Sequence, residues 1–111
     1  MSFNVRTEQN GVVVVAVDGQ LIVGNRQELK QRILDALEAG GRKFLIDFSR
    51  TGYIDSSGLG VLVSLSKKIR DQGGDLRLAA LNEDLKTLFE LTKLDTLFAI
   101  SDSPDEALAR F

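Results

Sequence analysis

The residues of this chain that are best suited to chemistry stand together in segment 55–60, which reads Asp-Ser-Ser-Gly-Leu-Gly. This composition is typical of a loop that opens into a helix, where free backbone N–H groups and the helix dipole favour negative charge. A serine here could therefore carry a phosphate. The two glycines lower helix stability by about 0.5–1 kcal/mol each relative to alanine, but they allow another backbone or a nucleotide to approach closely. A purely structural role also stays open, because Asp and Ser are favoured helix caps.

Several common catalytic arrangements are excluded by residue types that the chain lacks. It contains neither histidine nor cysteine, which rules out a Ser-His-Asp site, a cysteine nucleophile, and zinc bound through imidazole or thiolate. The dinucleotide pattern G-x-G-x-x-G fails because Val63 stands where the third glycine is needed, and the chain has no G-x-x-x-x-G-K-[ST] segment. We therefore expect no enzymatic activity, no metal and no cofactor.

Two further chemical interpretations depend on charged residues near segment 55–60. A Ser-Lys pair would need Lys67 or Lys68 beside Ser57, but these lysines lie about 15 Å further along the same predicted helix. A phospho-aspartate receiver would need a cluster of acidic residues at strand ends, and Asp47 with Asp55 is too small a set. Segment 55–60 is better suited to binding than to catalysis.

The overall composition predicts one compact domain spanning residues 1–111, because 43% of the residues are hydrophobic and 27% are charged. The formal net charge is −2, and 42–43 and 67–68 are only basic pairs, so nucleic acid is not an expected partner. The longest apolar run, 12–17, is too short to cross a bilayer, and residues 1–6 do not resemble a signal peptide. We expect a cytoplasmic protein without a membrane partner.

Hydrophobic patterning predicts an α/β fold with a mixed, largely parallel sheet, an N-terminal hairpin and about four helices. Residues 21–24 are expected to form a loop, and Asn25 is expected to cap the first helix. Glycine pairs 40–41 and 73–74 end the first two helices. The predicted strands are 3–7, 12–17, 44–48, 76–81 and 96–100, and the predicted helices are 25–39, 55–72, one that starts at Asn82 and one that starts at Ser103.

The second predicted helix carries two sets of apolar residues. Leu59, Leu62, Val63, Ser66 and Ile69 make one face that is suited to the sheet. Val61 and Leu65 lie about 120° from the centre of that stripe, at 100° per residue. They are either covered by a neighbouring helix or form an apolar strip beside Ser57 that a partner could bind.

The sequence resembles the STAS-domain family, and within it the anti-sigma factor antagonists. The resemblance lies in segment 53–62 (Tyr-Ile-Asp-Ser-Ser-Gly-Leu-Gly-Val-Leu), in the preceding run 44–49, and in segment 88–98, and it covers nearly the whole chain. It implies a partner-switching cycle in which the unphosphorylated protein binds an anti-sigma factor and frees the sigma factor. That anti-sigma factor is a serine kinase with its own ATP and magnesium.

The resemblance also implies which residues take part. Ser57, the second serine of the motif, is the implied phosphorylation site, and a metal-dependent serine/threonine phosphatase resets it. Ser56 is expected to be a cap or hydrogen-bond neighbour. The residues expected to bind the partner are Asp55, Ser56, Ser57, Gly58, Leu59, Gly60, Val61, Leu65, Leu21, Ile22 and Asn25.

One departure from the family pattern leaves alternatives open. The family often has Gly-x-Leu-Asp before its first helix, whereas residues 19–22 here read Gly-Gln-Leu-Ile, so Ile22 stands in the place of the aspartate. The first alternative is a STAS module that is not phosphorylated and works in a larger scaffold or transporter-regulating complex. The second alternative is a small-ligand or nucleotide binder at the start of the second helix.

Overall fold

The first two strands form the predicted hairpin, closed by a turn in which Gly11 has a φ of 85°, a conformation that glycine adopts without strain. The structure, a computed structural model, describes residues 3–111. Strand β1 (Phe3–Thr7) pairs antiparallel with β2 (Val12–Leu21). Strand β2 is longer than the predicted 12–17, because its second half continues to pair with its parallel neighbour.

The hairpin is the edge of one mixed sheet. Within residues 3–111 this sheet has five strands in the order β1-β2-β3-β4-β5, and all pairs after the first are parallel. The remaining strands are β3 (Lys43–Ile54), β4 (Asp75–Ala79) and β5 (Ala99–Ser101). The order follows from short right-handed crossovers through the helices, and it confirms the predicted fold class.

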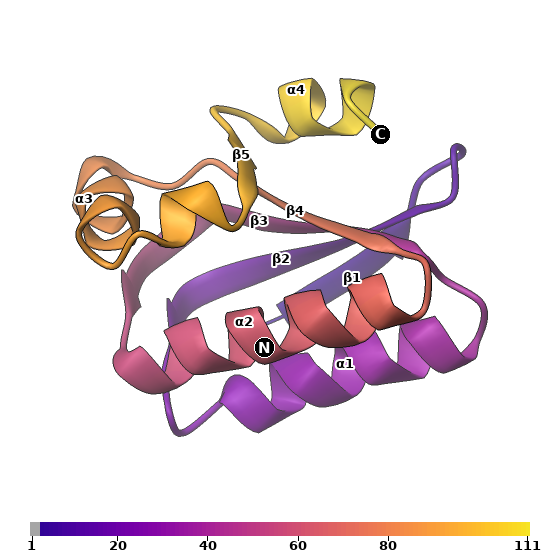
Figure 1. Cartoon of the computed structure of the whole chain (residues 1–111), viewed down its shortest axis with the longest axis horizontal. Coiled ribbons are helices and arrows are strands. Elements are labelled where there is room, and N and C mark those ends of the chain that lie inside the picture. The colour runs from indigo at the N-terminus through magenta and orange to yellow at the C-terminus, as the bar shows by residue number, and fades with distance from the viewer. Residues whose placement is uncertain (1–2) are drawn as a thin grey trace.

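Helices cover both faces of the sheet. Helices α1 and α2 lie side by side on one face, α4 lies on the other, and α3 packs at the end of the sheet where α2 begins (Figure 1). No helix in the described part of the chain is both long and apolar enough to cross a membrane. The four helices of residues 3–111 are α1 (Arg26–Glu38), α2 (Ser56–Asp71), α3 (Glu83–Leu91) and α4 (Pro104–Ala109).

Alternation along the strands divides the buried residues into two clusters. In β2, Val13, Val15 and Val17 face α1 and α2, whereas Val12 and Val14 face α4. The larger cluster includes a helical stripe from each of α1 and α2, because buried residues recur there at three- and four-residue spacing. The larger core thus holds α2 against the sheet.

Strand β3 differs most from the prediction, because residues 49–54, expected to be a loop, continue the strand. The pairing with β2 continues through two register shifts, and the buried hydroxyl of Thr51 donates a 2.7 Å hydrogen bond to the carbonyl of Val17. The Thr51 carbonyl accepts from the side chain of Asn82. These contacts hold the last residues of β3 in place up to the start of α2.

The C-terminal part also departs from the prediction at one strand. Residues 94–96 form a short 3-10 helix, η1 (Leu94–Thr96), and the last strand covers 99–101 rather than 96–100. Lys93, with a φ of 65°, turns the chain between α3 and η1. The predicted caps are confirmed: Asn82 accepts a bond from the backbone N–H of Leu85, and Ser103 accepts one from that of Glu106.

Candidate functional site

The start of α2 is held by Asp55, the residue that follows the end of β3. Its extended backbone places the side chain over the first turn, where Oδ1 accepts a 2.8 Å hydrogen bond from the backbone N–H of Gly58. The carbonyl of Asp55 accepts from the N–H of Leu59 at 3.0 Å. Asp55 is therefore a helix cap, one of the two roles that its residue type allowed.

Asp55 also joins α2 to the loop that precedes α1. Its second carboxylate oxygen, Oδ2, accepts a 3.1 Å hydrogen bond from the backbone N–H of Val23. Its own N–H donates to the carbonyl of Leu21 at 3.1 Å. Loop 22–25 and the first turn of α2 are thus one connected surface, which brings the predicted residues Leu21, Ile22 and Asn25 beside the Asp-Ser-Ser segment.

Asn25 lies at the expected position but acts differently from the prediction. Its side chain makes no capping bond to α1; Oδ1 accepts from the N–H of Ile22 at 2.9 Å, and Nδ2 donates to the carbonyl of Gln20 at 2.8 Å. The side chain turns back because the loop offers an unpaired donor and an unpaired acceptor nearby. Asn25 therefore fixes the shape of loop 22–25.

The two serines differ in exposure. Ser56 is exposed, whereas Ser57 is partly buried. Among residues 3–111, neither hydroxyl has a hydrogen-bond partner, and the N–H groups of both serines remain unpaired at the first turn of the 16-residue helix α2. A phosphate on Ser57 would lie close to these donors and to the positive end of the helix dipole.

Gly58 is required by the packing of the fold. A Cβ atom there would lie 2.5 Å from the carbonyl oxygen of Leu21 and 2.8 Å from Cγ2 of Ile54. The absent side chain lets β2 pass directly behind the first turn of α2. Gly58 is buried, so it supports the site from behind and offers no surface to a partner.

The predicted binding strip on α2 is wrong. Val61 and Leu65 are 4% and 1% exposed, because α1 lies against that side of α2. Leu21 and Leu59 are also buried in the main core. Val63, which was expected to face the sheet, is instead 38% exposed. The accessible members of the predicted binding set are Asp55, Ser56, Ser57, Gly60, Ile22 and Asn25.

Three exposed apolar residues around the first half of α2 were missed from the sequence as binding candidates. Val23 is 63% exposed, and its backbone N–H donates a hydrogen bond to Asp55. Tyr53 is 57% exposed and precedes Asp55 by two residues. Val63 follows Gly60 by three residues on the exposed side of α2. The sequence could have indicated the exposure of Tyr53, because consecutive strand residues point to opposite faces of a sheet and the next residue, Ile54, is apolar.

Replacing Asp55 tests whether this carboxylate connects the two segments. Asp55→Ala removes both the cap and the bond to the loop, so it should lower the free energy of unfolding by about 1–2 kcal/mol. Asp55→Asn keeps an oxygen for the Gly58 N–H but loses a charged acceptor, and should cost less than about 1 kcal/mol. Urea denaturation measures both; equal losses would contradict the double role.

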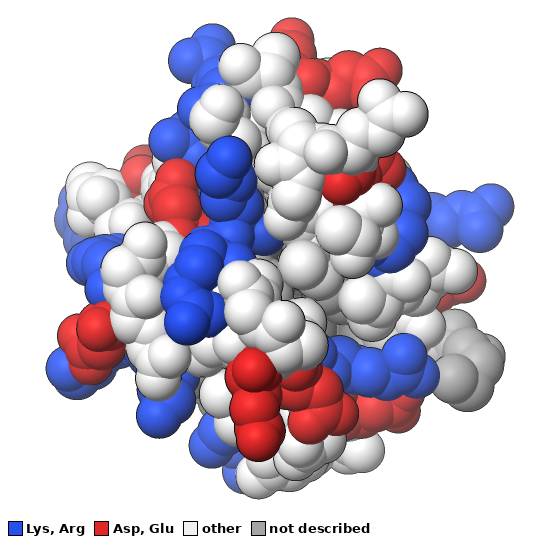
Figure 2. Space-filling model, turned by 90° about the vertical axis from the view of Figure 1, so that its right-hand side faces the viewer, with Lys and Arg blue, Asp and Glu red and all other residues white. Residues whose placement is uncertain are grey.

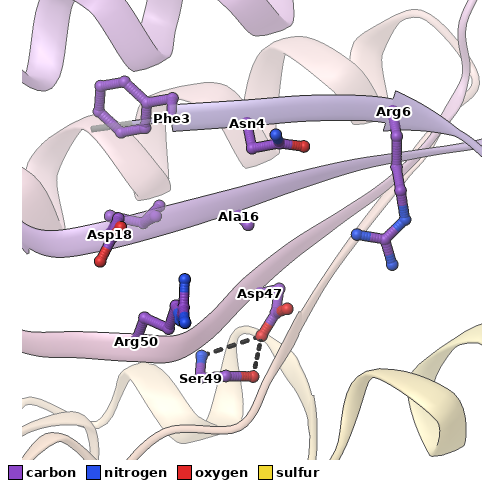
Figure 3. A pocket seen from close by; sticks show the side chains of 9 residues that line it. Phe3, Asn4, Arg6, Ala16, Asp18, Asp47, Ser49 and Arg50 are labelled. Atoms are coloured by element: carbon purple, nitrogen blue, oxygen red, sulfur yellow. Dashed lines mark hydrogen bonds between the residues drawn. The ribbon is translucent and has the colours of Figure 1, made fainter. Parts of the chain in front are cut away.

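A second feature lies on the sheet face opposite α1 and α2, where α4 leaves the strands uncovered. There, Asn4 and Arg6 of β1 lie above Asp18, Asp47 and Arg50 around a hollow of about 430 Å³ (Figure 3). Asp47 accepts bonds from the backbone N–H and the hydroxyl of Ser49. The side chains around the hollow carry charges of both signs, and residues 3–111 contain no cluster of three or more potential metal ligands.

The end of the molecule away from the start of α2 carries charges of both signs. Figure 2 shows side chains of lysine and arginine on this face, with those of aspartate and glutamate beside and below them. Arg77 and Asp75 form an ion pair at 2.9 Å. The basic side chains gather in the upper left and centre of this face and acidic side chains border them, and the net charge of the chain is −2, which does not favour a phosphate backbone. The start of α2 therefore remains the candidate site.

Comparison with known proteins identifies the family of the chain. A family model described as STAS domain matches residues 4–107. The chain is 34% identical over 102 residues to the anti-sigma-B factor antagonist of Bacillus subtilis, an alignment that covers 91% of this chain and 93% of that protein.

Solved structures share the fold. The crystal structure of a candidate anti-sigma factor antagonist from Thermotoga maritima has a TM-score of 0.90 and 30% identity, covering 97% of this chain and 92% of that one. The Bacillus protein SpoIIAA, an anti-sigma factor antagonist solved in unphosphorylated and phosphorylated forms, has a TM-score of 0.77 and 20% identity. The match to the unphosphorylated form covers 97% of this chain and 96% of that one. At that identity the likeness concerns the fold.

Proposed function

Because the chain belongs to the STAS domain family and is similar over nearly its whole length to anti-sigma factor antagonists, we propose that it is itself an anti-sigma factor antagonist. It binds an anti-sigma factor and so releases the sigma factor that the anti-sigma factor holds. The observation that carries the proposal is the accessible pair Ser56 and Ser57 at the first turn of α2, which Asp55 joins to loop 22–25.

The proposed binding surface is formed by the exposed residues around that turn. Ser56, Ser57 and Gly60 supply its small central part, and Val23 and Tyr53 supply apolar side chains at its border. Exposed apolar side chains next to small polar residues are suited to a protein partner, because they gain free energy when the partner removes water from them. The buried Val61 and Leu65 take no part in the surface.

Phosphorylation of Ser57 is the proposed switch. The added group carries a charge of about −1.5 to −2, and the unpaired N–H groups of the first turn favour it in the free protein. In the complex the same charge would have to lose water against the partner, which costs affinity. SpoIIAA has been solved in its phosphorylated form, so a protein with this fold accommodates a phosphate.

The chemistry of the cycle is assigned to the partners. The anti-sigma factor is the serine kinase and brings ATP and magnesium, while a metal-dependent serine/threonine phosphatase removes the phosphate. The chain contributes an accessible hydroxyl and a surface, without histidine, cysteine or a phosphate-binding P-loop. We place this cycle in the cytoplasm, where sigma factors act on transcription.

A STAS module that is never phosphorylated remains a second candidate, because of loop 22–25. Ile22 replaces the aspartate of the family pattern, and the neighbouring Val23 side chain is largely exposed. An apolar loop beside the helix start fits a lasting contact in a larger assembly as well as a switched one. The two candidates differ in whether Ser57 ever accepts a phosphate.

Phosphoryl transfer tests the proposal directly. The protein is incubated with the anti-sigma serine kinase encoded nearest to its gene, with ATP and magnesium, and intact mass is followed. We expect one phosphoryl group on the wild type and on Ser56→Ala, and none on Ser57→Ala. Phosphate on Ser56 would correct the assignment, and a stable complex that gains no phosphate would favour the unswitched module.

A further inference from the structure

The two glycines of the 55–60 segment occupy opposite environments. A Cβ atom at Gly58 would collide with the backbone of β2, whereas a Cβ atom at Gly60 would meet no heavy atom within 4 Å beyond its chain neighbours and the adjacent backbone of α2. Gly60 is exposed, and it is not among the described glycines with a positive φ. The conformation and packing of the free protein are therefore compatible with any small residue at position 60.

Glycine at position 60 is unfavourable for the free protein. It stands inside the continuous helix α2 (Ser56–Asp71), where glycine lowers helix stability relative to alanine because it loses more backbone entropy on folding. The first turn of α2 is already capped by Asp55, so Gly60 has no capping role. Neither the packing nor the backbone conformation of the described chain requires glycine at this position.

The surroundings of Gly60 indicate what comes close. Ser56 precedes it by four residues and Ser57 by three, the spacings at which residues are neighbours on a helix surface. Val63 follows by three residues and is 38% exposed, and Ser64 follows by four and is exposed. The outer side of α2 is thus a shallow strip with an apolar border, on which a backbone or a flat apolar surface could lie directly.

We propose that Gly60 is the point of closest approach between α2 and the anti-sigma partner, and that it determines the fit of the complex. This inference rests on the proposed function and adds the partner's shape and chemistry. The partner places an uncharged, apolar element against the bare backbone at Gly60 and against Val63. Direct contact of the partner with the backbone at Gly60 leaves no room for a hydrated phosphate on Ser57, which lies one turn away.

A graded substitution series tests this inference with two independent measurements. Gly60→Ala should raise the melting temperature of the free protein by about 2–6 °C, because alanine stabilises the helix and fits the open space. The same change should weaken binding of the purified anti-sigma serine kinase by about tenfold, and Gly60→Leu by more. Gln9→Leu, at an exposed position in the turn between β1 and β2, is the matched control and should leave the affinity unchanged.

The outcomes separate this inference from the function on which it rests. If the wild type does not bind the kinase, the proposed function and the inference both fail. If the wild type binds and Gly60→Leu binds equally well, the inference alone fails. A lower melting temperature for Gly60→Ala would show that glycine is needed by the fold, and this would also overturn the inference.

Discussion

Ser57→Asp is expected to weaken binding of the anti-sigma partner by about 100-fold or more, whereas Ser57→Ala should bind as tightly as the unmodified protein. A charge that must be desolvated at an interface, or that meets like charge there, costs several kcal/mol, and about 2.7 kcal/mol corresponds to 100-fold. Removing the Ser57 hydroxyl costs little, because that hydroxyl has no hydrogen-bond partner within residues 3–111.

The loss in Ser57→Asp should come from the interface, with folding unaffected. Negative charge in the first turn is favourable to a helix, and the N–H groups of Ser56 and Ser57 are free to face it. We therefore expect the melting temperature of Ser57→Asp to equal or slightly exceed that of the wild type. A large fall in melting temperature would mean that the substitution acts by unfolding α2.

Titration calorimetry with the purified anti-sigma serine kinase measures this prediction. Gln9→Asp is the matched control, because it adds the same charge at an exposed position in the turn between β1 and β2, and that turn lies at the other end of the sheet from the start of α2. It should change the affinity by less than about threefold, as expected for screened surface charges. Equal affinity of Ser57→Asp and Ser57→Ala would contradict the proposed switch.

The second large effect is expected from Gly58→Ala, which should destabilise the protein by about 2–3 kcal/mol. The new Cβ atom would lie 2.5 Å from the Leu21 carbonyl oxygen and 2.8 Å from Cγ2 of Ile54, so the backbone of β2 or α2 must move. That movement also strains the bond between the Asp55 N–H and the same carbonyl. Overpacking thus outweighs the gain in helix propensity from alanine.

Urea unfolding of the two glycine variants shows the contrast. Gly58→Ala should unfold at a lower urea concentration than the wild type, and Gly60→Ala at a higher one, with unchanged slopes. The two substitutions are chemically identical and lie two residues apart, so any general effect of alanine in α2 cancels. A Gly58→Ala protein within about 0.5 kcal/mol of the wild type would contradict the close packing of β2 behind α2.

The sequence was most informative where a local pattern decides the structure. The β-branched run 12–17, helical spacing in 29–37 and the caps at Asn82 and Ser103 each depend on residues close in the chain, and the structure confirms them. Residues 49–54 lack a continuous apolar run, and their pairing depends on Val17 and Asn82, which lie 34 and 31 residues away from Thr51. A local pattern cannot predict such contacts.

The composition of the site was predicted better than its exposed surface. The Asp-Ser-Ser segment does begin α2, and loop 22–25 does lie beside it. Whether Val61 and Leu65 face a partner or another helix depends on how α1 sits against α2, and helical periodicity is the same in both cases. Likewise, the different reasons for Gly58 and Gly60 appear only when neighbouring strands are in place.

Loop 22–25 is joined to the helix start through backbone atoms, and this affects how such proteins can diversify. Asp55 binds the backbone N–H of Val23, whereas the side chain at position 23 is 63% exposed, so the loop is held without a contribution from that side chain. Gly24 is similarly open, since an added Cβ would touch only the end of Ile22. Duplicated copies in one cell could exchange these side chains, choose different partners and avoid cross-talk, while each retains an unaltered serine switch.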